Sequence, residues 1–99
     1  MQKVKLTYKK GEEVRFIGHL DMVRVFQRAL RRADLPISYT EGFNPHPKIS
    51  FGPALKLGLT SEDQTLTLTL EKPLSLEEIK LKLDEVLPAG ISILTVAQI

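Results

Sequence analysis

The sequence contains no cysteine. Disulfides, thiolate metal sites, iron–sulfur clusters and cysteine nucleophiles are therefore excluded within these 99 residues. No apolar stretch is long enough to cross a bilayer, and the residues after Met1 lack the apolar run of a signal peptide. We therefore expect a cytoplasmic protein with no membrane partner.

Several catalytic motifs are also missing. The sequence has no glycine-rich phosphate-binding loop, no Gly-x-Ser-x-Gly motif and no metalloprotease helix. Its two histidines lack a nearby trio of carboxylates, so we expect no metal site. A chain of 99 residues is too short for a large multidomain enzyme with its own cofactor fold. We expect one domain over residues 1–99, with no cofactor in this chain.

The positive charge lies mostly in the first half of the sequence. Residues 1–52 hold ten Lys and Arg against five acids, a balance of +5, whereas residues 53–99 hold four against seven, a balance of −3. These balances sum to the net charge of +2. The asymmetry predicts one basic side, which attracts phosphates, acidic proteins or anionic membranes; an ordinary, unevenly charged surface is the alternative.

The first half of the sequence predicts a strand followed by a helix. Alternating Val4, Leu6 and Tyr8 indicate a half-buried strand over 3–9. Residues 14–17 are a second short extended candidate, or a continuation of the first strand after a kink at Gly11. Apolar residues on one arc predict a helix over 19–33, which Pro36 ends.

The second half predicts two strands, a helix and a last strand. Residues 49–51 form a strand that the leucine alternation extends past Pro53 to Leu59, 60–63 form a turn, and 65–70 form the clearest strand. Ser75 and Glu78 form a capping box that opens a helix ending at Pro88, and 91–97 is the last strand. The order predicts an α+β, ferredoxin-like βαββαβ fold, an antiparallel sheet with two helices on one face. The pieces 14–17 and 49–51 leave the strand count open.

A basic helical arc is the first candidate site. Arg24, Arg28, Arg31 and Arg32 lie opposite the apolar arc of the first helix. Because each guanidinium can donate two parallel hydrogen bonds, such an arc suits a phosphate backbone, although a solvated helix face looks the same. The lysines of the first strand extend this patch if that strand borders it.

The loop over 42–48 is the second candidate. Prolines on both sides of His46 restrict the backbone and hold the imidazole in place, and Asn44 can shape the turn. Phe43 either stacks on a base or docks in the core. With Lys48, these residues suit a nucleotide-binding or proton-transfer site, or simply a well-formed turn.

The start of the first helix is the third candidate. His19 follows Gly18 where free N–H groups favour an anion, and Asp21 either accepts a hydrogen bond from the imidazole or complements the helix dipole. An ordinary cap is the alternative. If His19 and His46 meet in space, an acid–base pair becomes possible.

The exposed sheet face is expected to carry threonines and lysines. Thr7, Thr65, Thr67, Thr69 and Lys5 should lie there, where an RNA-recognition sheet would place aromatic side chains. We therefore do not expect bases to stack on this sheet in that manner.

Two stretches, 15–33 and 42–54, resemble a bacterial family of unknown function, domain of unknown function 2344. Its members occur as partners of radical S-adenosylmethionine proteins or are fused to them. The resemblance implies that this chain corresponds to the N-terminal half of a longer family domain. It gives weight to the matching positions Gly18, His19, Asp21, Asn44, His46 and Lys48.

Three hypotheses follow from these residues and this resemblance. The first is a non-catalytic module that binds RNA or a ribonucleoprotein substrate for a radical S-adenosylmethionine partner, with the four arginines and Lys48 on phosphates and Phe43, Asn44 and His46 on the substrate. The second is a metal-independent endoribonuclease that uses His19 and His46. The third is a structural half-domain that docks on a partner or forms a homodimer.

Overall fold

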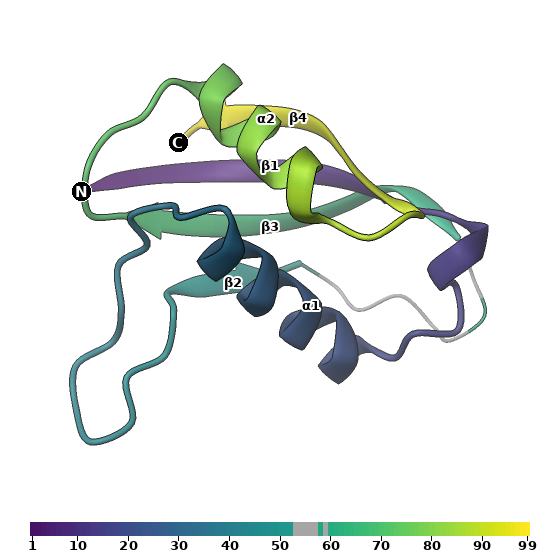
Figure 1. Ribbon diagram of the computed structural model, residues 1–99, viewed down its shortest axis with the longest axis horizontal. Coiled ribbons are helices and arrows are strands. Elements are labelled where there is room, and N and C mark those ends of the chain that lie inside the picture. The colour runs from purple at the N-terminus through teal and green to yellow at the C-terminus, as the bar shows by residue number, and fades with distance from the viewer. Residues whose placement is uncertain (53–57, 59) are drawn as a thin grey trace.

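The computed structural model describes residues 1–52, 58 and 60–99. These described residues form four strands, two α-helices and a short 3₁₀ helix. In chain order these are β1 (Gln2–Lys10), η1 (Glu12–Val14), α1 (His19–Arg32), β2 (Ile49–Phe51), β3 (Ser61–Leu70), α2 (Leu76–Val86) and β4 (Ile91–Gln98) (Figure 1). The predicted α+β fold with ferredoxin-like order is confirmed.

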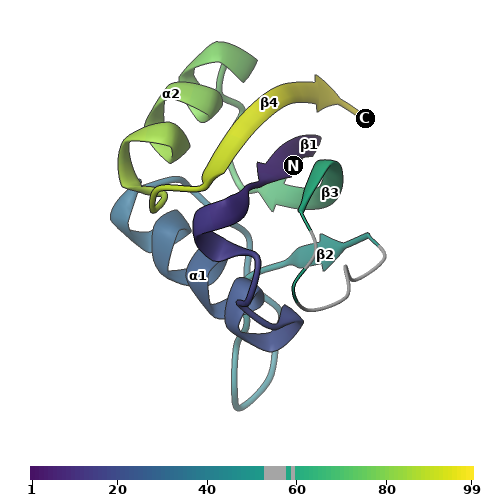
Figure 2. The same ribbon diagram turned by 90° about the vertical axis from the view of Figure 1, so that its right-hand side faces the viewer.

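The strands form one antiparallel sheet in the order β2-β3-β1-β4. The central strand β1 places Lys5 opposite Thr67 of β3 on one side and opposite Ala97 of β4 on the other. Both α-helices cover the same face of this sheet, and no described element covers the opposite face (Figure 2). We call that opposite side the open sheet face.

The core lies between the sheet and the two helices. Its largest fully buried side chains come from β1, β3 and both helices: Val4, Leu6, Phe26, Leu30, Leu66, Leu68, Leu70, Ile79 and Leu83. The ring of Phe26 from α1 packs 4.9 Å from Tyr8 and 5.8 Å from Phe51, measured between ring centroids. This aromatic cluster fixes α1 over the sheet. None of the described helices combines the length and apolarity needed to cross a membrane.

The two helices begin differently. Ser75 is the N-cap of α2, and its Oγ accepts a hydrogen bond from the backbone N–H of Glu78 at 3.1 Å. Gly18 is the N-cap of α1 and provides no side-chain hydrogen bond. At the far end of α2, Asp84 Oδ1 accepts from the N–H of Ile93 at 3.1 Å, which ties the helix to β4.

Two local predictions were wrong. Residues 14–17 are not extended, because the N–H groups of Val14 and Ile17 donate to the carbonyls three residues before them and form the tight turns after β1. Residues 60–63 are not a turn, because β3 begins at Ser61, which pairs with Lys10 of β1. Long-range pairing there overrides a polar, turn-like composition. The predicted extension of the strand past Pro53 lies outside the described residues.

Candidate functional site

The basic face of α1 consists of Arg24, Arg28, Arg31 and Arg32. All four side chains are exposed, as the helical period requires once Phe26 and Leu30 face the core. Arg24 lies 3.4 Å from Asp21 in an exposed ion pair, whereas the other three make no ion pair with a described residue. Three unneutralised guanidinium groups therefore lie within the last two turns of α1.

A hairpin arm, residues 37–49, projects from the body of the domain beside α1 (Figure 1). Its two sides are joined by backbone hydrogen bonds from Lys48 to Ser38 and from Thr40 to His46, each 2.8 Å long. The N–H of His46 also donates to Thr40 Oγ1 at 3.0 Å. The predicted loop is therefore an ordered hairpin, in which hydrogen bonds hold the backbone at His46 and at Lys48.

The tip of the arm presents its side chains to solvent. Phe43 is fully exposed, so its predicted alternative of docking in the core is wrong. Asn44 and His46 are exposed as well. Gly42 adopts a φ of 125°, in a region that favours glycine, and this conformation turns the chain just before Phe43.

The arm and the basic face meet in a hollow of about 210 Å³. Arg31 and Gln27 line it from α1, and Tyr39, Pro45, His46 and Pro47 line it from the arm. The structure thus brings together two of the three predicted candidate regions. Gln27 and Tyr39 were not among the predicted site residues, although Gln27 lies four residues before Arg31 and so shares its side of the helix.

Arg28 and Arg32 lie toward the other helix. They line a smaller hollow of about 190 Å³ together with Val25, Ala29, Val86 and Pro88 at the junction of α1 and α2. The basic face therefore extends from the hairpin arm across α1 to the end of α2.

His19 does not belong to this cluster. It is the first residue of α1, its side chain is exposed, and its ring contacts Phe51 edge-on at 5.5 Å. His46 lies beside Arg31, twelve residues further along the helix, which corresponds to roughly 18 Å of axial rise. The histidines are thus at opposite ends of α1, and a direct acid–base pair between them has no geometric basis.

Asp21 and Lys48 also lie elsewhere than the sequence suggested. Asp21 pairs with Arg24 rather than with the imidazole of His19. Lys48 lines a hollow of about 380 Å³ with Lys3 and Thr69, on the open sheet face rather than among the arginines. The base of the hairpin arm therefore separates Lys48 from the basic face.

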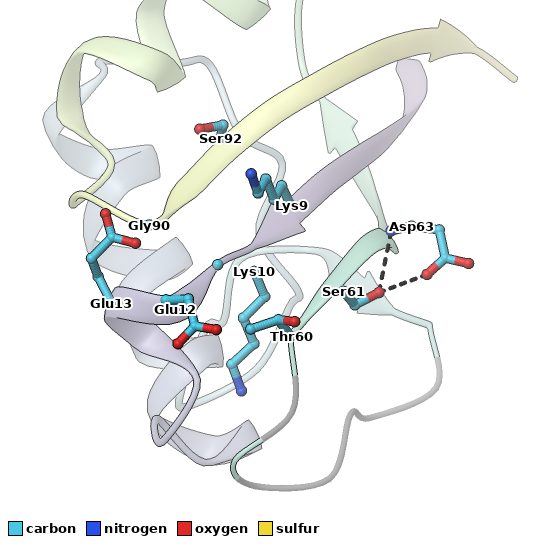
Figure 3. Close-up of a pocket in the computed structure, with 10 residues that line it drawn as sticks. Lys9, Lys10, Glu12, Glu13, Thr60, Ser61, Asp63, Gly90 and Ser92 are labelled. Atoms are coloured by element: carbon cyan, nitrogen blue, oxygen red, sulfur yellow. Dashed lines mark hydrogen bonds between the residues drawn. The ribbon is translucent and has the colours of Figure 1, made fainter.

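A larger hollow of about 840 Å³ lies at the far end of β1 (Figure 3). Both acidic and basic residues line it, among them Glu12, Glu13, Asp63 and Lys9. Lys10, also at this wall, is only 3% exposed; its Nζ donates to the carbonyl of Ile17 at 2.7 Å, and burial lowers its pKa. None of the predicted site residues lines this hollow.

The candidate site combines the exposed guanidinium groups of α1 with the exposed imidazole of His46. Among residues 1–52, 58 and 60–99, no three His, Cys, Asp or Glu side chains gather as metal ligands would. The fold and this surface define a two-layer α+β domain with one strongly basic helix.

The chain belongs to a bacterial protein family. The family model of domain of unknown function 2344, described as an uncharacterized protein conserved in bacteria, matches residues 3–99. No curated protein matches the chain. The resemblance recognised in the sequence is thus confirmed at the level of the family.

Proposed function

We propose that this domain binds RNA, or the RNA of a ribonucleoprotein, through the basic face of α1 and the adjoining hairpin arm. The observation that carries the proposal is the hollow shared by Arg31 and His46. It joins the unneutralised guanidinium group of Arg31 to an exposed imidazole and to the ring of Tyr39, which is 44% exposed. Guanidinium groups bind phosphates through paired hydrogen bonds, and exposed aromatic rings stack on unpaired bases.

The arrangement favours binding over catalysis. A general base must lie within hydrogen-bond reach of the proton that it removes, and the second histidine lies at the other end of α1. The proposal therefore assigns His46 to contact and not to proton transfer. In keeping with the resemblance, a radical S-adenosylmethionine protein would perform the chemistry on the bound RNA.

A titration of a fluorescein-labelled single-stranded RNA by fluorescence anisotropy tests the proposal. We expect measurable affinity at 50 mM salt that falls steeply toward 200 mM, because phosphate contacts release counterions. Arg31→Glu should weaken binding roughly tenfold. It should also make the slope of log affinity against log salt concentration shallower by about one. Lys72→Glu is the matched control, since it makes the same change in net charge at an exposed residue outside the basic face.

Two results would contradict the proposal. One is an absence of RNA affinity at 50 mM salt for the folded wild-type domain. The other is an equal loss for Arg31→Glu and Lys72→Glu, since it would show that net charge alone determines the affinity. The role of the partner is tested separately, by asking whether a purified radical S-adenosylmethionine protein modifies RNA only when the wild-type domain is added.

A further inference from the structure

The open sheet face carries a second set of cations. Lys3 and Lys5 alternate with the buried residues of β1 and so point away from the helices. Lys48 reaches the same face from the base of the hairpin arm, where it lines a hollow with Lys3. None of these three lysines makes an ion pair with a described residue, although elsewhere Arg15, Arg24, Lys80 and Lys82 all do.

The lysines lie among hydroxyl groups in three rows across the sheet. The backbone pairing of the strands defines the rows as Lys48–Thr69–Lys3–Ile99, Ser50–Thr67–Lys5–Ala97 and Gly52–Thr65–Thr7–Thr95. No side chain in these rows carries a carboxylate, and the two apolar side chains among them, Ala97 and Ile99, both lie at the β4 edge. The part of the face over β2, β3 and β1 is therefore polar and positively charged.

We infer that the open sheet face is a second phosphate-binding surface, on which Lys3, Lys5 and Lys48 hold the backbone of an RNA strand. The inference rests on the proposed function for the identity of the ligand, but it uses none of the residues of the basic face. Lysine binds phosphate as a point charge, and hydroxyl side chains add hydrogen bonds to the phosphate oxygens.

The composition of the face favours a nucleic acid over a protein. Protein–protein interfaces have an apolar, aromatic-rich centre, which these rows do not offer. Interfaces with nucleic acids are more polar, wetter and more positively charged. The spacing of the lysines also fits an extended chain of phosphates. Lys3 and Lys5 are separated by roughly 6.8 Å along β1, and Lys3 and Lys48 by roughly 9.6 Å across two strand spacings.

The chemistry of the contact sets its specificity. With no aromatic side chain in the rows, bases have no stacking platform, so the strand is held by its phosphates alone. Binding on this face is therefore independent of base identity, in contrast to the hollow where Tyr39 and His46 can contact a base. The hairpin arm joins the two surfaces, since Lys48 lies at its base on one side and Pro47 lines the hollow on the other.

The test compares two double variants that each remove two positive charges. Lys3→Gln with Lys5→Gln changes the open sheet face, and Lys72→Gln with Lys82→Gln is the control on exposed or partly exposed residues elsewhere. The probe is a labelled oligouridylate of roughly 16 nucleotides. We expect the sheet-face variant to bind about fivefold more weakly, and the slope of log affinity against log salt concentration to become shallower by about 1.4. The affinity of the control variant should change less than twofold. The N–H signals of Thr67 and Lys5 should shift on titration in NMR spectra.

The outcomes separate this inference from the proposed function. If Arg31→Glu weakens binding but the sheet-face variant does not, the inference is overturned and the proposed function stands. If no variant or wild-type domain binds RNA, linear polyphosphate is titrated instead. If only the sheet-face variant loses affinity for polyphosphate, the face binds phosphates but not RNA. If the wild-type domain does not bind polyphosphate, the inference is overturned. Equal affinity for polyglutamate would overturn it as well, because the face would then recognise acidic polypeptides.

Discussion

Helices α1 and α2 cover the same face of the sheet, but their outer sides are built on different principles. On α2, positive and negative side chains neutralise each other one turn apart: Lys80 lies 2.8 Å from Asp84, and Lys82 lies 3.5 Å from Glu78. Pairs of this kind keep a helix soluble and add a few tenths of a kcal/mol. Both lysines of α2 are therefore paired within the helix, whereas its exposed Glu77 and Glu85 make no ion pair with a described residue.

On α1, three of the four basic side chains are unpaired. Arg31 and Arg32 lie three and four residues after Arg28, at spacings where like charges repel, and no described carboxylate neutralises these three arginines. Arginines in this arrangement cost stability that an anionic ligand would restore. The two helices therefore share a structural role on their inner sides but differ in how the charges on their outer sides are paired.

The equivalence of the inner sides can be tested by truncation in the core. Phe26 is fully buried in the aromatic cluster, and Leu83 is fully buried on α2. We expect Phe26→Ala to lower the free energy of unfolding by about 3–5 kcal/mol and Leu83→Ala by about 2–5 kcal/mol, measured by urea denaturation. Phe26→Leu provides a milder variant if Phe26→Ala does not fold. A loss below 1 kcal/mol at either position would show that the corresponding helix is not anchored in the core.

The cluster beneath α1 also makes stability depend on pH. Tyr8 is 4% exposed, and burial raises its pKa to about 12 from its ordinary value of 10.0. As the pH rises above 10, the unfolded chain loses this proton first, so the free energy of unfolding should fall by roughly 2 kcal/mol between pH 10 and pH 12.

The Tyr8→Phe variant isolates this effect. Burial lowers the pKa of Lys10, so stability rises with pH where the folded protein has lost this proton and the unfolded chain still holds it, but this contribution is the same in both proteins. The difference between wild type and Tyr8→Phe therefore reports Tyr8 alone. Parallel pH profiles of the two proteins above pH 10 would contradict the expected effect.

The helix starts provide a smaller contrast. Ser75→Ala removes the hydrogen bond to the N–H of Glu78 and should cost about 1 kcal/mol. Gly18→Ser adds a capping hydroxyl at a position where a Cβ meets nothing within 4 Å, and it should add a few tenths of a kcal/mol. Thermal unfolding of both variants gives the two signs directly. A destabilised Gly18→Ser protein would show that α1 requires glycine at its start for another reason.

Features that depend on nearby residues were predictable from the sequence. The helix over 19–33 was placed to within one residue of α1, because its apolar period and Pro36 are local signals. The same period identified which arginines face the solvent. The start of β3 at Ser61 was missed, since its polar residues are recruited into the sheet by pairing with β1.

The composition of the candidate site depended on contacts between distant residues. Whether Tyr39 or Lys48 lies beside Arg31 is decided by the path of the hairpin arm relative to α1, which no local pattern encodes. Strand alternation explains afterwards why Lys48 shares a face with Lys3 instead. The separation of His19 from His46 has the same origin, because the loop folds back on the end of α1 rather than on its start.

The smallest expected effect tests the electrostatic difference between the helices most directly. Arg28→Gln leaves helix propensity nearly unchanged but removes repulsion with Arg24, Arg31 and Arg32, so it should stabilise the ligand-free domain by about 0.5 kcal/mol at low salt. Lys80→Gln removes the pair with Asp84 and should destabilise by about 0.3 kcal/mol. Both differences should shrink toward zero at 1 M salt, where charges on the surface are screened.

Opposite signs for these two substitutions are the signature of one helix whose basic side chains are paired with acids and one whose basic side chains mostly are not. A destabilised Arg28→Gln protein would mean instead that the stem of Arg28 contributes packing beside Val86 and Pro88, whose side chains line the same hollow. Salt separates the two cases, because lost packing persists at 1 M salt whereas relieved repulsion does not. In the packing case, the contact between α1 and α2 would account for Arg28, and only Arg31 and Arg32 would remain as unexplained charges that call for an anionic partner.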